Sequence, residues 1–355
     1  MKHHKIKMAE TPAECNAITH DGPFHGDDVF ACAILLTLGP VTLLRTRDPS
    51  IISEKISAND IIIFDVGGSY EPSVGLYDHH QTDFCRTRDN GIPYASAGLI
   101  WEEYAELVLA LELYSCAEED IQSVKERVDR NLIQGIDARD YGLVSNDISM
   151  TVSGFISLYN PRWDDQYLYN ERFLAAVEEA YKILHMTILN AISIGRGKKA
   201  VGEIVNGIKD DSTEVLVFPQ FIGGWQSQIV NMESDAAKRL KFVVYKDAKK
   251  KNQYNAQAVP LNYASTQSEV RAVFPVEWRG VSESRLSQMT GIESALYCHK
   301  AGHLAIASTE EGAIALANLA LKTMKQQADS VEETEENNES AALMNEEVRE
   351  FYDVV

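Results

Sequence analysis

A ten-residue segment near the N-terminus is rich in side chains that can bind metal ions. The segment 19–28 reads THDGPFHGDD and holds two histidines and three aspartates. Imidazole nitrogens mixed with carboxylate oxygens suit Mn²⁺, Mg²⁺ or Fe²⁺ better than a metal that prefers thiolate ligands. A short His-x-Asp pattern is by itself more often an ordinary polar loop than a ligand set. Further segments must therefore supply the rest of any metal site.

Three later segments carry side chains of the same kind. Asp65 ends an apolar run, residues 78–80 read Asp-His-His, and Asp137 and Asp140 form an Asp-x-x-Asp pair. Each has a plainer interpretation, because aspartates also form turns and cap helices, and adjacent histidines can be surface residues. Two ions about 3.5–4 Å apart, joined by a carboxylate, could activate water for attack on phosphorus. The four segments together indicate such a site, with Asp65 as the candidate bridge.

The elements that would position these residues are predicted to be strands of one sheet. Short apolar runs precede the first three segments, and NDIIIFDVGG, which contains Asp65, is typical of a strand buried on both faces of a parallel sheet. Helical periods follow over residues 27–39, 96–114 and 118–137. Alternating strands and helices predict an α/β domain with a mostly parallel sheet, in which functional residues gather at the carboxyl ends of the strands.

A smaller mixed α+β domain is predicted to follow. A long helix over residues 170–192 is expected to close near Gly195–Gly197, a plausible hinge. Short strands are expected at 214–219, 241–247, 254–261 and 294–299, with a last helix over 310–325. The predicted organisation is a disordered start over 1–13, the α/β domain over 14–195, the mixed domain over 196–325 and a disordered acidic tail over 326–355.

Charge and composition narrow the classes of partner. The chain of 355 residues has 45% hydrophobic and 24% charged residues, as a soluble globular protein does, and its net charge is −20. Residues 326–355 hold ten acidic side chains against Arg349 and so carry −9, which leaves −11 for the rest. This acidity disfavours duplex binding but is compatible with an enzyme that acts on single strands or small molecules.

The cysteines and the N-terminus bear on the compartment and on membranes. The five cysteines are scattered and never form a Cys-x-x-Cys pair, which favours a reducing compartment. No secretory or transit peptide is evident, and no apolar stretch approaches the roughly 20 residues of a membrane span. The expected location is the cytoplasm or the nucleus, with no membrane partner.

The ordered motifs resemble the Myg-type family, named for the melanocyte proliferating gene and grouped with the DHH-type phosphoesterases. The resemblance extends over about residues 16–324 and is carried by T-H-x-G-x-F-H-x-D (19–27), R-T-R-D-P (45–49), D-V-G-G-x-Y (65–70), Y-D-H-H-Q (77–81), S-A-G-L-I (96–100), D-A-x-D-x-G (137–142), W-R-G (278–280) and T-x-E-G-A (309–313). It implies a DHH-type catalytic domain, a substrate-binding C-terminal domain and a metal site in the cleft. It also implies Mn²⁺-dependent 3′→5′ exonuclease activity, chiefly on RNA, and allows a mitochondrial location.

The resemblance implies roles for residues of the first domain. The implied metal ligands are His20, His25, Asp27, Asp65 and His79. Either Asp140 or Asp137 would complete the second metal site, with a slight preference for Asp140. Among the catalytic residues, Asp78 would orient its neighbours, and His80 would support the ligands or contact the phosphate. Asp28 and Tyr141 stand where the family often has Glu and Asn, and neither change should remove a ligand.

Substrate contacts are expected from three further side chains. Arg279 is a candidate phosphate clamp, because a guanidinium matches two phosphate oxygens at once. His303 lies in the segment 301–304, AGHL, where many family members carry Gly-Phe-Ile-Gly, and it could meet a phosphate as glycine-histidine loops do in other DHH proteins. Arg47 could contact the substrate backbone or lie in a solvated turn. The sequence supports these two interpretations about equally.

Three functional hypotheses follow. The first is a metal-dependent phosphodiesterase, a 3′→5′ exonuclease on single-stranded RNA or short oligonucleotides with two Mn²⁺ ions, or Mg²⁺ in their place. The second is a small-molecule phosphatase that acts on pyrophosphate or a nucleotide, which the lack of basic patches favours. The third is a non-catalytic metal-binding scaffold, which the intact ligand set disfavours.

Overall fold

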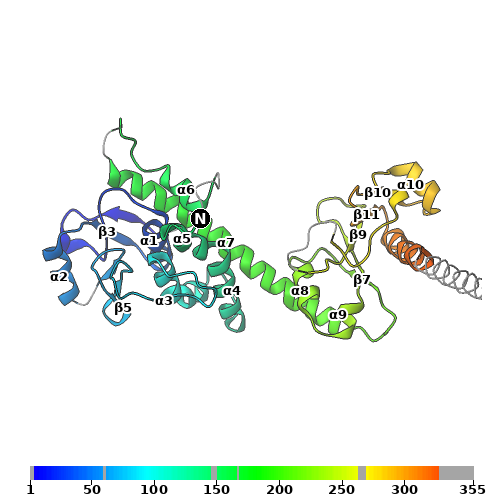
Figure 1. Cartoon of the computed structure of the whole chain (residues 1–355), viewed down its shortest axis with the longest axis horizontal. Helices are drawn as coiled ribbons and strands as arrows, with labels where there is room; N and C mark the ends of the chain where they lie inside the picture. The colour runs from blue at the N-terminus through cyan, green and yellow to red at the C-terminus, as the bar shows by residue number, and fades with distance from the viewer. Residues whose placement is uncertain (1–3, 59–60, 145–149, 166–167, 263–268, 328–355) are drawn as a thin grey trace, which may run out of the picture. The chain divides into compact units, whose positions relative to one another are not determined.

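The chain divides into two compact units, Met1–Gly195 and Arg196–Val355. The computed structural model describes residues 4–58, 61–144, 150–165, 168–262 and 269–327. Figure 1 shows the secondary-structure elements of both units, coloured along the chain. Each unit has its own sheet and its own hydrophobic cores, so each is described by itself. In the described part of the chain, every helix is too short or too polar to span a membrane.

The first unit is built on a six-stranded, mostly parallel sheet, in agreement with the predicted α/β class. Its strands are β1 (Ile6–Met8), β2 (Ala17–Thr19), β3 (Val41–Arg45), β4 (Ile62–Phe64), β5 (Tyr70–Glu71) and β6 (Leu76–Tyr77). The order is β1-β3-β2-β4-β6-β5, and only the β5–β6 pairing is antiparallel. Because β2, β4 and β6 are parallel neighbours, the segments that follow them emerge at the same edge of the sheet.

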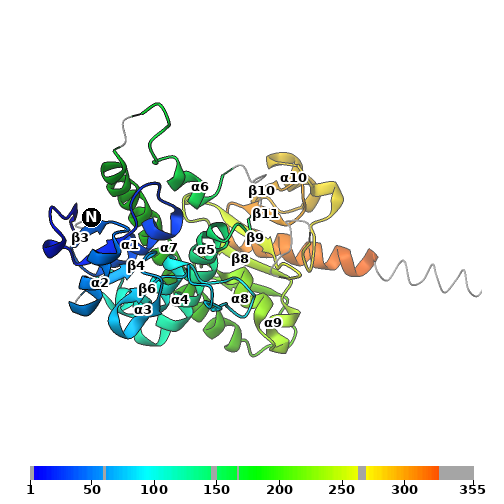
Figure 2. The same ribbon diagram turned by 60° about the vertical axis from the view of Figure 1, so that its left-hand side comes forward.

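Helices cover this sheet and complete its cores. They are α1 (Gly26–Leu38), α2 (Pro49–Ala58), α3 (Ser96–Ala110), α4 (Ile121–Val128), α5 (Gln134–Asp140) and α6 (Val152–Ser157). On β4, Phe64 lies in the core formed with α1 and α3, whereas Ile63 lies in a smaller core with Ile52 of α2. Figure 2 shows β4 and β6 with α1, α2 and α3 around them. The strand is therefore buried on both faces, as its apolar run predicts.

The predicted disorder of residues 1–13 is wrong for residues 6–8. These residues form β1, which pairs in parallel with β3 at the edge of the sheet. Ile6 and Met8 pack against the first core and Lys7 points outward. A three-residue strand carries too short a pattern to be recognised in the sequence, since its stability comes from its partner strand. Residues 1–3 and 328–355, including almost all of the predicted acidic tail, lie outside the described residues.

The long helix α7 (Tyr169–Asn206) does not close at Gly195–Gly197, so the predicted end of this helix is wrong, whereas the hinge predicted there stays a prediction. A glycine within a helix costs only about 1 kcal/mol. Val201 and Val205, further along the same helix, are fully buried in a core of the second unit and offset that cost. Gly197 has a different reason to be glycine, because a Cβ atom there would lie 1.9 Å from the carbonyl oxygen of Gly223.

The second unit is a mixed α+β arrangement on a five-stranded sheet. Its strands are β7 (Val215–Phe218), β8 (Phe242–Lys246), β9 (Tyr254–Ala258), β10 (Ala295–Cys298) and β11 (Leu304–Ala307), in the order β10-β11-β9-β8-β7. Only β7 and β8 pair in parallel. Its helices are α8 (Trp225–Asn231), α9 (Asp235–Arg239), α10 (Glu283–Thr290) and the helix over 310–327, orange in Figure 2. Val243 and Val244 of β8 face separate cores on the two sides of the sheet.

Candidate metal centre

The histidines and aspartates singled out in the sequence meet at the carboxyl-terminal edge of the first sheet. His20 directly follows β2, Asp65 follows β4, and residues 78–80 follow β6. Asp27 lies in the first turn of α1, which begins shortly after β2. The parallel order of these strands therefore brings together residues that lie far apart in the sequence.

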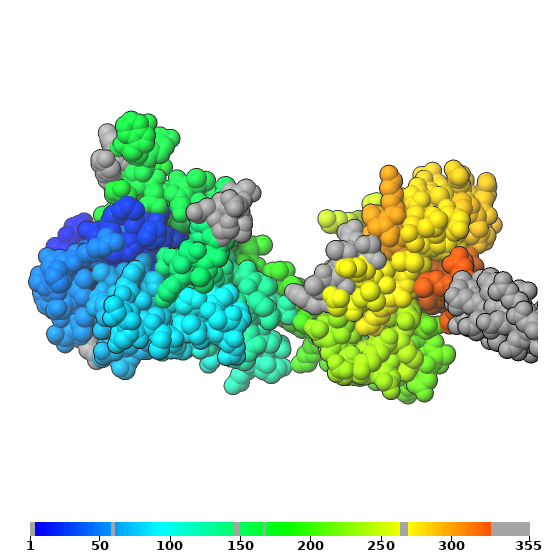
Figure 3. Space-filling model, in the orientation of Figure 1, coloured from blue at the N-terminus to red at the C-terminus, as the bar shows by residue number. Residues whose placement is uncertain are grey.

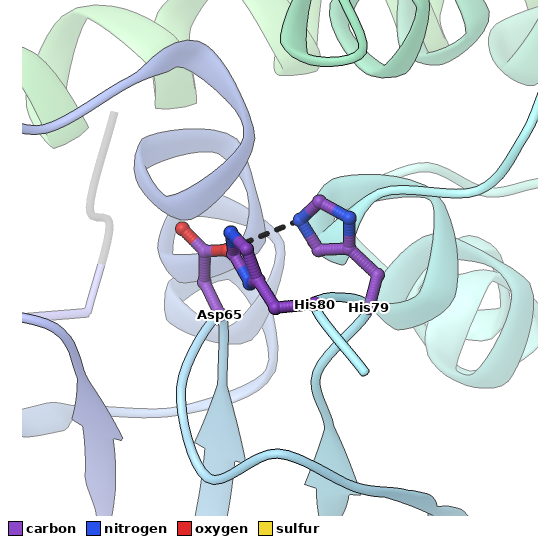
Figure 4. Close-up of side chains that lie close together, drawn as sticks. All are labelled: Asp65, His79 and His80. Atoms are coloured by element: carbon purple, nitrogen blue, oxygen red, sulfur yellow. Dashed lines mark hydrogen bonds and ion pairs between the residues drawn. The ribbon is translucent and has the colours of Figure 1, made fainter. Parts of the chain in front are cut away.

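Asp65 lies between histidines that come from two different strands. Its Oδ2 atom is 3.2 Å from Nε2 of His20, and its Oδ1 atom is 3.2 Å from Nε2 of His79. Figure 4 shows Asp65 with His79 and His80, whose Nδ1 atom is 3.6 Å from the same Oδ1. Because its two oxygens face different imidazoles, Asp65 has the geometry of a carboxylate that could join two cations.

The ligand atoms form three groups with the spacing of a metal site. Within each group, one atom from each residue lies within 4.8 Å of the others; the groups are Asp65, His79 and His80, then His20, Asp28 and Asp65, then His25, Asp27 and Asp140. Nε2 of His79 also lies 3.5 Å from Oδ2 of Asp27 and 3.5 Å from Oδ2 of Asp140. The third group therefore adjoins the first, and the three groups form one centre.

Of the two aspartates predicted as alternatives, Asp140 lies among the ligand atoms and Asp137 does not. Asp137 is fully buried, its Oδ1 accepts a hydrogen bond of 3.0 Å from the backbone N–H of Gly98, and its Oδ2 is 2.8 Å from the guanidinium of Arg88. Arg88 also pairs with Asp129 at 2.6 Å. Asp137 thus ties α5 to the start of α3, and the ligand role predicted for it does not fit this position.

Asp28 belongs to the centre, although the sequence motif identified it only as an aspartate at a position where the family often has glutamate. Its Oδ2 is 3.3 Å from Nε2 of His20, while its Oδ1 accepts a hydrogen bond of 2.9 Å from the backbone N–H of His25. Asp28 therefore caps the first turn of α1 with one oxygen and faces the centre with the other. The signal in the sequence was the position of two successive aspartates at the start of a helix that follows a strand.

Two hydroxyl groups that sequence reasoning missed also support the ligands. Oγ of Ser96, at the first residue of α3, is 3.3 Å from Oδ1 of Asp65. The hydroxyl of Tyr141 donates to the carbonyl of Tyr94 at 3.3 Å and lies 3.1 Å from Nδ1 of His79. Ser96 is the first residue of the S-A-G-L-I motif, and Tyr141 was noted only because the family often has Asn at that position. The residue type at neither position indicates that the side chain contacts a metal ligand.

Hydrogen bonds fix which ring nitrogen of two histidines faces the centre. Nδ1 of His20 is 2.9 Å from the carbonyl oxygen of Asp21, to which it donates. Because the Tyr141 hydroxyl gives its own proton to a carbonyl, it accepts one from Nδ1 of His79. In both residues Nε2 is therefore the atom directed at the carboxylates, as in histidines held by a partner for metal binding.

The charges of the centre are strongly coupled. Burial lowers the pKa of His20, but the hydrogen bond with Asp65 and the charge of Asp28 outweigh burial and raise the pKa to about 9. The nearby carboxylates of Asp27 and Asp65 likewise outweigh burial and raise the pKa of His79 to about 12. Burial opposes the ionisation of Asp65, yet these two imidazoles hold its pKa well below the usual value. Positive charge is thus favoured beside these carboxylates, and a divalent cation could supply it.

The remaining carboxylates provide a direct test of whether metal ions fit. Both carboxylate oxygens of Asp27 and Oδ2 of Asp28 are buried and accept no hydrogen bond within the described ranges. A buried carboxylate oxygen without a donor is costly unless a cation satisfies it. Burial and the charge of Asp27 also raise the pKa of Asp140 to about 7. The unpaired oxygens and the mixed nitrogen and oxygen donors fit hard or intermediate divalent cations.

Asp78 and Gly68 shape the rim of the centre. Oδ1 of Asp78 accepts hydrogen bonds from Nδ1 of His80 at 2.7 Å and from the backbone N–H of His79 at 2.8 Å. Its Oδ2 accepts the N–H of Gly68 at 2.6 Å. Asp78 therefore has the geometry of an orienting residue. Gly68 has φ +70°, and a Cβ atom there would meet nothing within 4 Å, so the turn leaves open space.

The two arginines at the end of β3 and just after it have different surroundings. Arg45, the last residue of β3, is buried, with its guanidinium 5.6 Å from the ring centre of Phe24 and 4.5 Å from that of Phe173. Arg47 is exposed and forms a 2.8 Å ion pair with Asp21, next to His20. Arg45 is therefore a structural residue, and Arg47 remains the candidate for substrate contact.

The substrate-binding candidates of the second unit lie close to each other. Nε of Arg279 donates to the carbonyl of Phe274 at 3.0 Å, and a Cβ atom at Gly302 would lie 2.6 Å from that Nε. His303 is buried, its Nδ1 has no hydrogen-bond partner in the described part of the chain, and its ring lies 4.5 Å from that of His299. Glycine at 302 is what allows the arginine to approach this loop.

Tryptophan side chains could stack on nucleobases, but Trp225 and Trp278 are buried in the cores of the second unit. Trp163 is 89% exposed.

Comparisons with known proteins extend over most of the chain. Residues 16–321 match a family model named for the MYG1 exonuclease and described as an uncharacterised protein family. The MYG1 exonuclease of Mus musculus is 29% identical over 331 residues, covering 85% of this chain and 84% of the relative. The MYG1 protein of Schizosaccharomyces pombe is 27% identical over 325 residues, covering 85% and 96%.

One solved structure is also similar at low level. It is RecJ from Thermus thermophilus in complex with Mg²⁺, with a TM-score of 0.25 and 11% identity, covering 89% of this chain and 51% of RecJ. A likeness of this size does not establish a shared fold.

Proposed function

The chain belongs to the MYG1 exonuclease family, and from this premise we propose that it is a metal-dependent nuclease that shortens single-stranded nucleic acid from one end. We further propose that it degrades its substrate in the 3′→5′ direction, prefers RNA or short oligonucleotides and uses Mn²⁺, with Mg²⁺ as the alternative. Relatives named as exonucleases support the nuclease activity. The preference for RNA, the direction of degradation and the identity of the metal are proposed from the family resemblance of the sequence motifs.

The observation that carries the proposal is the position of Asp65. It contributes to two of the three ligand groups, and its neighbours Asp27 and Asp28 hold buried oxygens without hydrogen-bond donors. A scaffold protein would have no need to bury carboxylate oxygens that accept no hydrogen bond around one shared residue, because doing so reduces stability. Such an arrangement is explained if it holds two cations for chemistry.

Different residues of this chain would have different roles at the site. Two bound divalent ions would lower the pKa of a water molecule and neutralise charge on the phosphate. Asp65 would hold both sites at a fixed separation, and His20 and His79 would present Nε2 as fixed donors. His80 would bind a phosphate oxygen, because its side chain is 61% exposed while its Nδ1 is held by Asp78. That hydrogen bond raises the pKa of His80 and favours the imidazolium form that donates to an anion.

The second unit would supply affinity for the substrate. Arg279 would clamp a phosphate, and His303 would meet another polar group of the oligonucleotide. Arg47 would contact the substrate backbone from the first unit. These contacts would explain how a chain with a net charge of −20 binds a polyanion, since a few placed cations can replace a general basic surface.

A reconstitution assay tests the proposal. Protein stripped of metal is incubated with end-labelled single-stranded RNA, single-stranded DNA, duplex and pyrophosphate, and Mn²⁺ or Mg²⁺ is then added. We expect a ladder of shortened single strands that appears only with metal and is strongest for RNA. Shortening of a 5′-labelled strand from its 3′ end supports the proposed direction. Hydrolysis of pyrophosphate alone would instead establish a small-molecule phosphatase, and no hydrolysis with full metal content would establish a scaffold.

A further inference from the structure

A pocket of about 370 Å³ lies in the first unit directly beside the metal centre. Its wall begins at Gly68, whose N–H is bound to Asp78, and includes Gln81, whose Nε2 donates to the carbonyl of Asp78 at 3.1 Å. Phe84 forms another part of the wall, and its ring packs edge-on against His79 with 6.4 Å between ring centres. One aromatic side chain therefore touches a candidate metal ligand on one side and lines the pocket on the other.

The lining of the pocket suits a flat, neutral ring. Tyr70 stands perpendicular to Phe84, with 6.0 Å between the ring centres. The guanidinium of Arg86 lies 5.3 Å from the centre of the Tyr70 ring and donates to its hydroxyl. Two perpendicular rings offer a face for stacking and an edge for a lateral contact. The volume is at the lower end of the range for small-molecule sites, which is about 300–1,000 Å³.

The charges at the pocket disfavour a phosphate as its occupant. Glu71 and Asp83 both line it, against the single cation Arg86. A phosphate would meet a net negative wall, whereas a nucleobase carries no charge and has amino groups that carboxylates can accept. The strand β5, which contributes Tyr70 and Glu71, lies at the edge of the sheet, and Glu71 is exposed there. The segment that carries these residues, light blue to cyan in Figure 3, reaches the surface of the first unit.

We propose that this pocket receives the nucleobase of the nucleotide at the scissile end of the strand, stacked on Phe84 and contacted laterally by Tyr70. The inference rests on the proposed nuclease function, because it places the base beside the phosphate that the metal centre attacks. It deepens that function, since the enzyme then recognises a terminal nucleoside as well as a phosphodiester. An end that lacks a base should be a poor substrate.

A double comparison of protein and substrate tests the pocket. Two oligonucleotides are prepared that differ only in the attacked terminal residue, which carries a normal base or is abasic. Removal of the first residue is measured with wild-type protein and with Phe84→Leu, which keeps an apolar side chain against His79 but removes the aromatic face. Leu107→Ala is the matched control, because Leu107 is 58% exposed on α3 and does not line this pocket. Metal content is measured for every protein.

We expect wild-type kcat/KM to be at least about fivefold higher for the end with a base, the scale of one stacking contact. Phe84→Leu should lose most of that preference, mainly by slower cleavage of the base-bearing end, with unchanged metal content. Equal cleavage of both ends by the wild type, or an equal loss on both ends in Phe84→Leu, would overturn the inference while leaving the nuclease function intact. If the wild type cleaves neither strand, the proposed function fails and the inference falls with it.

Chemical modification provides a second test that does not depend on a variant of Phe84. Cys85 lines the pocket and is exposed, whereas Cys15, Cys32 and Cys298 are buried. A bulky maleimide on Cys85 should fill the pocket and reduce the preference for the base-bearing end to near unity. The same reagent should not alter the preference of Cys85→Ser protein. A full preference after complete labelling of Cys85 would contradict the proposed position of the base.

Discussion

Asp65 has a strained backbone conformation and also belongs to two of the three ligand groups. Its φ angle is +56°, in the left-handed region that residues other than glycine seldom adopt. Its backbone N–H is bound to the carbonyl of Tyr77 at 3.2 Å, so pairing between strands holds the strained turn in place. Strain of this kind persists where the surrounding structure enforces it, often at functional sites. Here it directs the carboxylate between His20 and His79.

We predict that Asp65→Asn folds normally and loses at least about a hundredfold in rate, equivalent to a few kcal/mol of transition-state stabilisation. Asparagine tolerates the left-handed region as aspartate does, so the turn should survive. Its amide has no negative charge, and two cations beside it would repel each other with less compensation. Turnover on labelled RNA and metal content measured by elemental analysis check the prediction. His4→Ala, at an exposed position, is the control, and wild-type turnover with full metal content in Asp65→Asn would refute the bridging role.

The sequence predicted most of the centre, but only where residue type alone was informative. Histidines and aspartates after apolar runs pointed to His20, Asp27, Asp65 and His79, and these residues do lie together. Asp28 could not be separated from an ordinary helix cap, because it also makes the cap contact. Ser96 and Tyr141 have side chains with many possible roles, and only the three-dimensional arrangement shows that they touch Asp65 and His79.

A second prediction at the residue scale concerns protons. The pKa of His20 is raised to about 9 and that of His79 to about 12, so both are protonated at neutral pH without metal. A metal ion needs the neutral imidazole and must displace these protons. Metal affinity should therefore rise with pH between about 6 and 9. Calorimetric titration with Mn²⁺ in buffers of different ionisation enthalpy should show net proton release.

The raised pKa of His20 has the opposite effect on the stability of the metal-free protein, which should fall as the pH rises. A folded-state pKa of about 9 for His20 lies above its unfolded value of about 6.5. Its pairing with Asp65 and Asp28 is therefore fully stabilising below about pH 6.5 and is lost as the pH rises through about 9. Melting temperatures of metal-free protein across this window should fall with pH. A rising melting temperature, or no proton release on metal binding, would contradict the assignment.

At the scale of elements, the helix α7 shows that two glycines in one segment can differ in function. A Cβ atom at Gly195 would meet nothing within 4 Å, whereas one at Gly197 would clash with Gly223 at 1.9 Å. We predict that Gly195→Ala raises stability by about 0.5–1 kcal/mol, because alanine loses less entropy in a helix. Gly197→Ala should lower it by about 1–3 kcal/mol through overpacking. The free energy of unfolding of both variants is measured by denaturant titration. Equal changes in the two variants would argue against the close approach of Gly197 to the carbonyl of Gly223.

The elements found from the sequence were those with long patterns. The apolar runs at β4 and β8 carry enough apolar residues to be recognised, and both form strands. The strands β5 and β11 were missed because two residues, or the small side chains of LAIA, give little periodic signal. The continuation of α7 was missed because its burial beyond Gly197 depends on a core that the local sequence does not reveal.

At the scale of the whole molecule, the two units carry different kinds of polar group. Every residue of the three ligand groups belongs to the unit Met1–Gly195, whereas Arg279 and His303 belong to Arg196–Val355. Each unit has separate buried cores, so a surface change in one should leave the other folded. Metal binding and substrate affinity should therefore be separable by mutation.

We predict that Arg279→Ala raises KM for an oligonucleotide by about tenfold, the effect of losing roughly 1.4 kcal/mol of binding, with unchanged metal content. His303→Ala should act in the same direction, because burial and the neighbouring His299 lower the pKa of His303 and keep its imidazole neutral, so that its loss removes a polar contact and no charge. Arg285→Ala, which removes an exposed guanidinium from α10 of the same unit, is the matched control and should leave KM unchanged. Steady-state kinetics and elemental analysis are measured on all three variants. Loss of bound metal in Arg279→Ala or His303→Ala would show that the second unit takes part in holding the cations, because no ligand group in the described residues includes either side chain.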